Sequence, residues 1–61
     1  MTEFHTEISR QAAQAIQALD TARESGDDYL ASVRQSELEG LARLADEHGL
    51  RIPALSAFRA A

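Results

Sequence analysis

The sequence has no cysteine or tryptophan, one proline and three glycines, and its six cationic side chains are all arginine. The absence of cysteine excludes disulfide bonds and thiolate metal ligands. The two histidines, His5 and His48, lie far apart in the sequence. We therefore expect no metal site and no bound cofactor.

Long apolar runs are also missing, since the longest uninterrupted apolar stretches contain two or three residues. A membrane-spanning helix needs roughly 20 apolar residues in succession, so no such segment is expected. The first residues, Met1 to Phe4, lack the basic and apolar regions of a secretion signal. We expect a cytoplasmic protein with no membrane contact.

The small size of the chain, 61 residues, predicts one domain, residues 1–61, that gains stability from a partner. A domain of this length buries only about 60% of the surface that its unfolded chain exposes. Domains below roughly 70–80 residues usually rely on a disulfide, a metal or another chain. With the first two excluded, self-association remains.

The charge is unevenly distributed, with a net charge of −4. Residues 1–28 carry six acidic side chains and two arginines, whereas residues 29–61 carry four of each. The apolar share of 44% and the charged share of 26% are typical of a folded domain. A protein dedicated to nucleic acids usually has a basic face, so binding of nucleic acid is not expected.

Apolar spacing in the first half predicts a helix over residues 6–24, with Thr6 as a plausible N-cap. Steps of four and three place five residues on one face: Ile8, Ala12, Ala15, Leu19 and Ala22. The three alanines on that face allow a second helix to approach closely. Phe4 and Ile16 flank it.

A short break at residues 25–28 predicts an antiparallel second helix over residues 28–48. Gly26 suits the left-handed position after a helix, and Ser25 with Asp28, or Asp27 alone, can cap the next one. The apolar face of the second helix is about 140° wide and consists of Leu30, Val33, Leu38, Leu41, Leu44, Ala45 and His48. Gly49 then supplies a helix end, with Leu50 as its hydrophobic contact.

An alternative to one continuous second helix is a break near its middle. Ser36 and Glu39 have the spacing of a capping box, so the helix could restart there, and Gly40 weakens it by about 1 kcal/mol relative to alanine. We favour a continuous helix. After the connector, Pro53 begins a short helix over residues 53–59. There, Leu50, Ile52, Leu55 and Phe58 can fold back onto the hairpin as a lid.

The predicted fold is therefore all-α: an antiparallel helical hairpin with a short C-terminal helix. We expect two hairpins to pair into a homodimeric four-helix bundle, because one hairpin leaves part of its apolar surface exposed. Whether the two chains run parallel or antiparallel stays open. The residues expected at this interface or at a partner's are Ile8, Leu19, Leu30, Val33, Arg34, Glu37, Leu41, Leu44, His48, Leu55 and Phe58.

Three of these residues are polar. Arg34 and Glu37 are three apart, so they can pair within the helix and set the register of a helix–helix contact. The alternative is that both side chains extend into solvent. His48 near the helix end is expected to favour the C-terminal carbonyls, and a pH-sensitive contact is the alternative.

No enzyme activity is expected, and no catalytic residues are proposed. The adjacent Asp46, Glu47 and His48 point in different directions on a helix. The Glu-x-x-His signature of metal-binding bundles is absent because position 45 is alanine. A hairpin of this size also has little volume for a concave active site.

Residues 41–60 resemble a helix-turn-helix of the repressor type. Ala45, Gly49, Leu50, Leu55 and Phe58 stand at the small, turn and apolar positions of that pattern. The resemblance implies a recognition helix over residues 53–60 that enters the major groove of DNA. Few of its outward side chains can recognise bases: Arg59, with Arg51 just before it.

Two functions follow. The leading expectation is a non-enzymatic protein–protein interaction module, a homodimerising regulator, adaptor or docking element, whose C-terminal apolar segment can also bind another protein. The alternative is a small DNA-binding regulator that uses residues 41–60. If the alternative holds, DNA binding weakens steeply with salt and is lost in Arg51→Ala and Arg59→Ala. A DNA titration at several salt concentrations distinguishes the two, since an interaction module shows neither effect.

Overall fold

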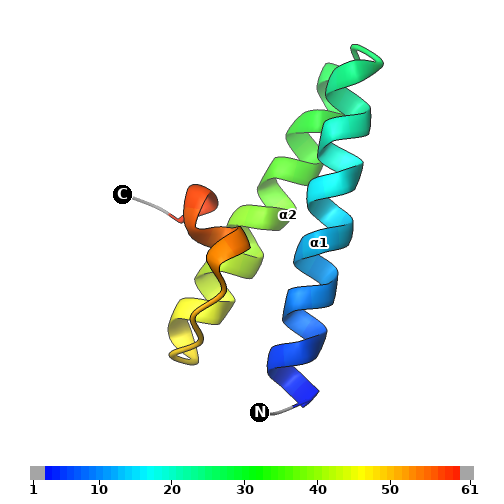
Figure 1. The fold of residues 1–61 in the computed structure, drawn as a ribbon. Coiled ribbons are helices and arrows are strands. Elements are labelled where there is room, and N and C mark those ends of the chain that lie inside the picture. Colours follow the sequence, from blue (N-terminus) through cyan, green and yellow to red (C-terminus); the bar gives the residue numbers. More distant parts are fainter. Residues whose placement is uncertain (1–2, 60–61) are drawn as a thin grey trace.

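Two antiparallel α-helices and a short 3-10 helix make up residues 3–59, the part of the chain that the computed structural model describes (Figure 1). The helix α1 spans Glu3–Glu24, α2 spans Asp28–Glu47 and the 3-10 helix η1 spans Pro53–Phe58. These residues contain no strand. The expectation of an all-α helical hairpin is confirmed.

Alanine dominates the contact between α1 and α2. On α1 the five residues predicted to form the apolar face are all buried: Ile8, Ala12, Ala15, Leu19 and Ala22. On α2 the buried residues are Leu38, Ala42 and Ala45. Because most of these side chains are small, the two helices pack closely, and Ile8, Leu19 and Leu38 are the only large side chains of α1 and α2 that are buried.

The sequence predicted the apolar face of α2 with the wrong centre. Ala42, which the prediction omitted, is almost fully buried, whereas Leu30, Val33, Leu41 and Leu44 are only half-buried. His48 was expected at the middle of the face but is exposed. A face about 140° wide is broader than one neighbouring helix can cover, and α1 covers the edge that carries the alanines.

The start of α1 also differs from the prediction. The helix begins at Glu3, so Thr6 lies within it and is not its N-cap. Glu3 places a negative charge in the first turn, where the helix dipole favours it. The Phe4 ring packs against the His48 ring at the end of α2, with ring centroids 4.7 Å apart. This tertiary contact supports the additional turn.

The turn between the helices follows the capping chemistry of its residues. Gly26 has a φ of +72°, and the N–H of Asp27 donates to the Ala22 carbonyl at 2.9 Å. The N–H of Gly26 donates to the Arg23 carbonyl, which completes a Schellman ending. Asp27 then caps α2, since its carboxylate accepts a hydrogen bond from the Leu30 N–H at 3.0 Å.

The far end of α2 closes in the same way. Gly49 has a φ of +67°, and the N–H of Leu50 donates to the Ala45 carbonyl at 2.8 Å. The helix ends at Glu47, with His48 as the C-cap, one residue earlier than predicted. It continues through Ser36 and Gly40, so the restart considered at Ser36 does not occur.

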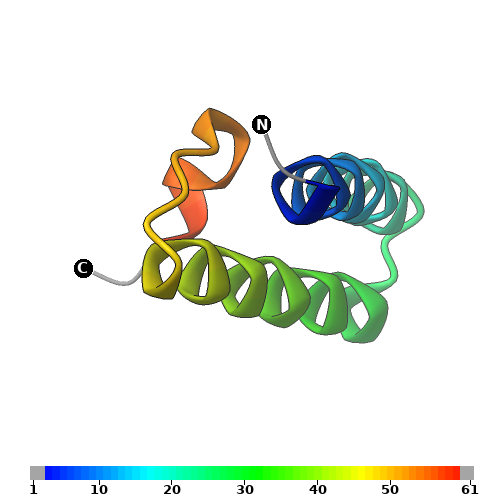
Figure 2. The same cartoon turned by 90° about the horizontal axis from the view of Figure 1, so that it is seen from below.

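The C-terminal segment folds back on the hairpin, as predicted, but as a 3-10 helix that ends at Phe58 and not as a helix over residues 53–59. Ile52 before the proline is extended, as residues before proline tend to be. Leu55 is buried, and Leu50, Ile52 and Phe58 pack against the core. As a result η1 lies across α2 and beside α1 (Figure 2).

Within residues 3–59, no helix combines the length and the apolar composition that crossing a membrane requires.

Removal of the Asp27 cap should destabilise the hairpin. We expect Asp27→Ala to lower the free energy of unfolding by about 1 kcal/mol, because the Leu30 N–H loses its acceptor. Asp27→Asn keeps a capping oxygen and should remain close to the parent protein. Urea denaturation at one fixed protein concentration measures both variants. Equal destabilisation by alanine and asparagine would contradict the assignment of the cap.

Candidate functional site

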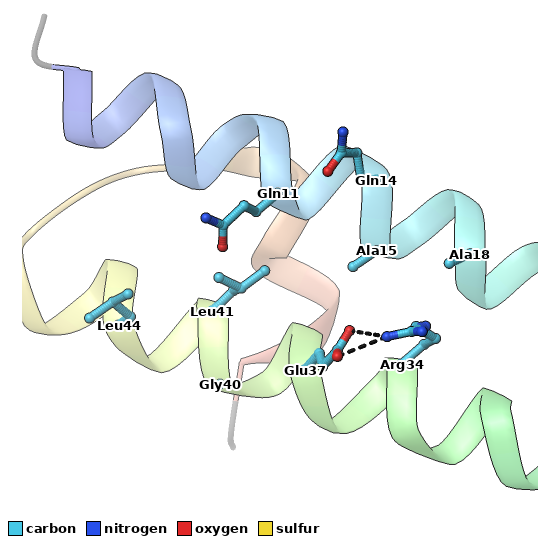
Figure 3. Close-up of a pocket in the computed structure, with 9 residues that line it drawn as sticks. All are labelled: Gln11, Gln14, Ala15, Ala18, Arg34, Glu37, Gly40, Leu41 and Leu44. Atoms are coloured by element: carbon cyan, nitrogen blue, oxygen red, sulfur yellow. Dashed lines mark hydrogen bonds and ion pairs between the residues drawn. The ribbon is translucent and has the colours of Figure 1, made fainter.

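A groove of about 600 Å³ runs between α1 and α2 (Figure 3). The α1 side is formed by alanine and glutamine, and the α2 side by leucine, glycine and one ion pair. The residues that line it are Gln11, Gln14, Ala15, Ala18, Arg34, Glu37, Gly40, Leu41 and Leu44. Because Ala15, Ala18 and Gly40 have little or no side chain, the space between the helices stays open here.

The groove and η1 lie on opposite flanks of α2. Hollows beside η1 are lined by Glu39, Ala42 and Asp46, among others. With Leu38 as the reference, the helical rotation places these three residues about 40° to 100° to one side. It places Leu41 and Leu44 about 60° and 120° to the other side. The C-terminal segment therefore covers one flank of α2 and leaves the other uncovered.

Four large apolar residues of α2 follow the uncovered flank. We call Leu30, Val33, Leu41 and Leu44 the apolar row; all four are half-buried. Leu41 and Leu44 also pack against the core of the hairpin, whereas Leu30 and Val33 lie outside that cluster. Tyr29, 81% exposed, borders a shallow hollow beside Val33 and extends the apolar surface outward.

An ion pair lies within the apolar row, between Val33 and Leu41. Nη1 of Arg34 donates to both carboxylate oxygens of Glu37, at 2.8 Å each (Figure 3). The Arg34 side chain is 32% exposed and the Glu37 side chain 49%. Pairs as exposed as this one contribute little to stability, between 0 and about 1 kcal/mol. Nε of Arg34 is buried and has no hydrogen-bond partner among the described residues.

The α1 rim of the groove is held by a local network around Glu7. The Gln11 amide donates to the Glu7 carboxylate at 2.9 Å, and Arg10 forms an ion pair with the same carboxylate. The hydrogen bond from Arg10, followed by that from Gln11, lowers the pKa of Glu7 below its ordinary value. Conversely, Glu7 raises the pKa of Arg10.

The structure separates the residues predicted for an interface into three groups. Ile8, Leu19 and Leu55 are buried inside the hairpin. The apolar row and the Arg34–Glu37 pair come together on one flank. His48 and Phe58 lie outside this flank, at the end of α2 and in η1.

His48 adopts the local role that the sequence predicted. Its Nδ1 lies 3.0 Å from the carbonyl oxygen of Leu44, one of the last carbonyls of α2. Its ring contacts Phe4. The sequence reasoning missed Gln11, Gln14, Ala18 and Gly40, which complete the groove. At 100° per residue, Gln11, Gln14 and Ala18 lie about 40° to 100° around α1 from Ala15, beside the buried face. Helical periodicity could therefore have identified them.

The segment that resembles a helix-turn-helix keeps its packing pattern but not its second helix. Ala45 and Leu55 are buried and Gly49 forms the turn. However, Pro53–Phe58 is a six-residue 3-10 helix. The Arg59 guanidinium pairs with the Asp46 carboxylate, with N–O distances of 3.0 and 3.1 Å. Ala60, the last residue of the proposed recognition helix, lies outside the described residues.

Between Glu3 and Arg59, no three histidine, aspartate or glutamate side chains converge where they could hold a metal ion. No protein-family model matches the sequence, and no curated protein or solved structure shows significant similarity to it.

The Glu7 network predicts a stability change in acid. Because the folded state lowers the pKa of Glu7 from its ordinary value of 4.5, the network stabilises the fold above that pH. This contribution is lost as the pH falls through the lowered value. Thermal melts at pH 7 and in acid measure this loss. The difference between the two midpoint temperatures should be smaller for Glu7→Gln than for the parent chain. Glu24→Gln on the same helix is the control, and an equal reduction there would contradict the prediction.

Proposed function

We propose that this chain is a non-enzymatic interaction module that self-associates through the apolar row. The observation that carries the proposal is the flank of α2 that η1 leaves uncovered, where the four residues of the apolar row are only half-buried: Leu30, Val33, Leu41 and Leu44. The last two line the groove beside α1. Complete burial of a leucine or valine contributes roughly 1.5–3 kcal/mol relative to full exposure. Part of that free energy remains to be gained at each of the four residues.

The small core supports a partner for the same reason. Only four large apolar side chains are buried in the described residues: Ile8, Leu19, Leu38 and Leu55. A core of this size leaves a single hairpin marginally stable. A second hairpin over the apolar row would make a four-helix bundle and bury the remaining apolar surface. Closed two-fold pairing is the most common arrangement of such chains.

The chemistry of the groove favours binding over catalysis. Its polar groups are two amides and an ion pair whose charges neutralise each other. Neither of its charged groups faces a serine or histidine across the groove that could form a nucleophile–base pair. Alanine and leucine form the rest of its lining, as in a helix-binding groove.

Self-association through the apolar row would leave η1 accessible. The hollow beside Phe58 and Arg59 lies on the other flank of α2. Another protein could bind there while the dimer persists, as expected for an adaptor or docking element in the cytoplasm. One of the two arginines that the DNA-binding alternative needs, Arg59, is paired with Asp46 in the described C-terminal segment, which argues against that alternative.

Val33→Asp tests the proposal without disturbing the core, since Val33 lies outside the core cluster. We expect the parent chain to sediment at the dimer mass from low micromolar to near-millimolar concentration. Val33→Asp should weaken dimerisation by at least about tenfold, because a carboxylate would be buried in an apolar contact. Its helical circular dichroism should be unchanged.

Ser32→Asp is the matched control. It adds the same charge at the neighbouring, exposed position, about 100° around α2 from Val33 and outside the apolar row, and should leave dimerisation unchanged. A parent chain at the monomer mass throughout the concentration range would overturn the proposal. So would equal weakening by the two substitutions.

A further inference from the structure

The flank of α2 that carries the apolar row reads the same in both directions. Leu30, Val33, Glu37, Leu41 and Leu44 follow one another in steps of three, four, four and three residues. Glu37 is the midpoint of this series. A second α2 that runs in the opposite direction therefore presents the same spacing to the first.

We propose that the apolar row binds a second copy of the chain in antiparallel orientation, with a two-fold axis that passes close to Glu37. This inference rests on the proposed self-association and specifies its geometry. Around that axis, Leu30 faces Leu44 of the second copy and Val33 faces Leu41. Each apolar residue is then matched by another, over about 21 Å of helix.

Gly40 provides the space that this arrangement needs. The two-fold axis places Gly40 of the second copy opposite Arg34. Apart from the neighbouring residues and the backbone of α2 itself, a Cβ atom built on Gly40 meets nothing within 4 Å, so the space above this residue is open. The Arg34 side chain can therefore cross the second helix at this point and reach Glu37 of the second copy.

The charged residues of the groove in one copy are complementary to those in the second copy. Nη1 of Arg34 makes both hydrogen bonds to Glu37 of its own chain. A guanidinium has five N–H donors, so donors remain for a second carboxylate. Near the axis, the two Glu37 carboxylates would each lie between two Arg34 guanidinium groups. Glu37 faces Glu37 in either orientation, but a parallel dimer would also place Arg34 against Arg34, whereas the antiparallel dimer offsets the two Arg34 residues by about 9 Å along the helix axis.

The overall charge of the chain also favours this flank as the place where two copies meet. The chain has a net charge of −4, so two copies repel each other in most orientations. Arg34 and Glu37 are the only charged residues that line the groove, and their charges cancel. Two chains that meet over this flank bring neutral surfaces together.

Spin-label distances measure the direction of the second copy. The parent chain has no cysteine, so a single cysteine can be labelled cleanly. Ser36→Cys and Glu47→Cys both replace exposed residues outside the apolar row. In the antiparallel dimer the two labels at position 36 are offset by only about 3 Å along the helix axis, and those at position 47 by about 30 Å.

Pulsed electron paramagnetic resonance should therefore give a short distance at position 36 and a long one at position 47. Short distances at both positions would show a parallel dimer and overturn the inference while leaving self-association intact. Absence of a dipolar signal, together with the monomer mass, would overturn the proposed function itself. The dimer mass of each labelled protein is checked by sedimentation before the distance measurement.

A charge exchange tests the ion pairs across the axis. Arg34→Glu gathers four carboxylates near the axis, and Glu37→Arg gathers four guanidinium groups. We expect each variant alone to dimerise at least about tenfold more weakly than the parent chain. A one-to-one mixture should recover dimers of mixed composition, because each chain then supplies what the other lacks.

Circular dichroism of the separate variants checks that both remain helical. The double variant Arg34→Glu/Glu37→Arg is the control and should dimerise like the parent chain. A mixture that associates no more tightly than its separate components would overturn the proposed contact between Arg34 and Glu37 of the second copy.

Discussion

Close packing of α1 against α2 through alanine determines how the rest of the chain is arranged. Ala12 and Ala15 from α1 meet Ala42 and Ala45 from α2 in the buried core. Small side chains let the helices approach, but they bury little apolar area themselves. Apart from Leu38, the large apolar residues of α2 lie on one flank of this contact, where they are only half-buried.

The C-terminal segment covers the opposite flank of α2. Gly49 reverses the chain at the end of α2, and Pro53 begins the helix η1, which brings Leu55 into the core. In the described chain this segment lies on a single side of α2. The flank that carries the apolar row has no corresponding element in the described chain. The asymmetry of the described fold thus follows from the turn at Gly49, which directs the segment to one side of α2.

The uncovered flank combines features that seldom occur together on a solvated helix face. Its apolar residues repeat with helical spacing, and the ion pair between them cancels its own charge. Gly40 leaves open space beside them. A solvated face would show mixed charges without this spacing. The proposed dimer accounts for all three features with one arrangement, since a reversed copy matches the apolar residues, the charges and the space.

Much of this structure could be predicted because it depends on local rules. The two helices, the left-handed glycines at 26 and 49, the Asp27 cap and the Arg34–Glu37 pair each involve residues within a few positions of one another. The buried face of α1 was also predictable, because its apolar residues form a narrow stripe between polar neighbours. No comparable local signal distinguishes the alanine edge of α2 from its leucine edge.

The sequence by itself thus determined where the helices form, how they end and which face of α1 is buried. Only the tertiary structure decided which edge of α2 is covered, where α1 begins and that the last helix is of the 3-10 type. The reason is geometric. The apolar face of α2 is wider than one neighbour can cover, so its burial depends on where α1 and η1 lie in space. The first turn of α1 likewise depends on the contact of Phe4 with His48, which is 44 residues away in the sequence.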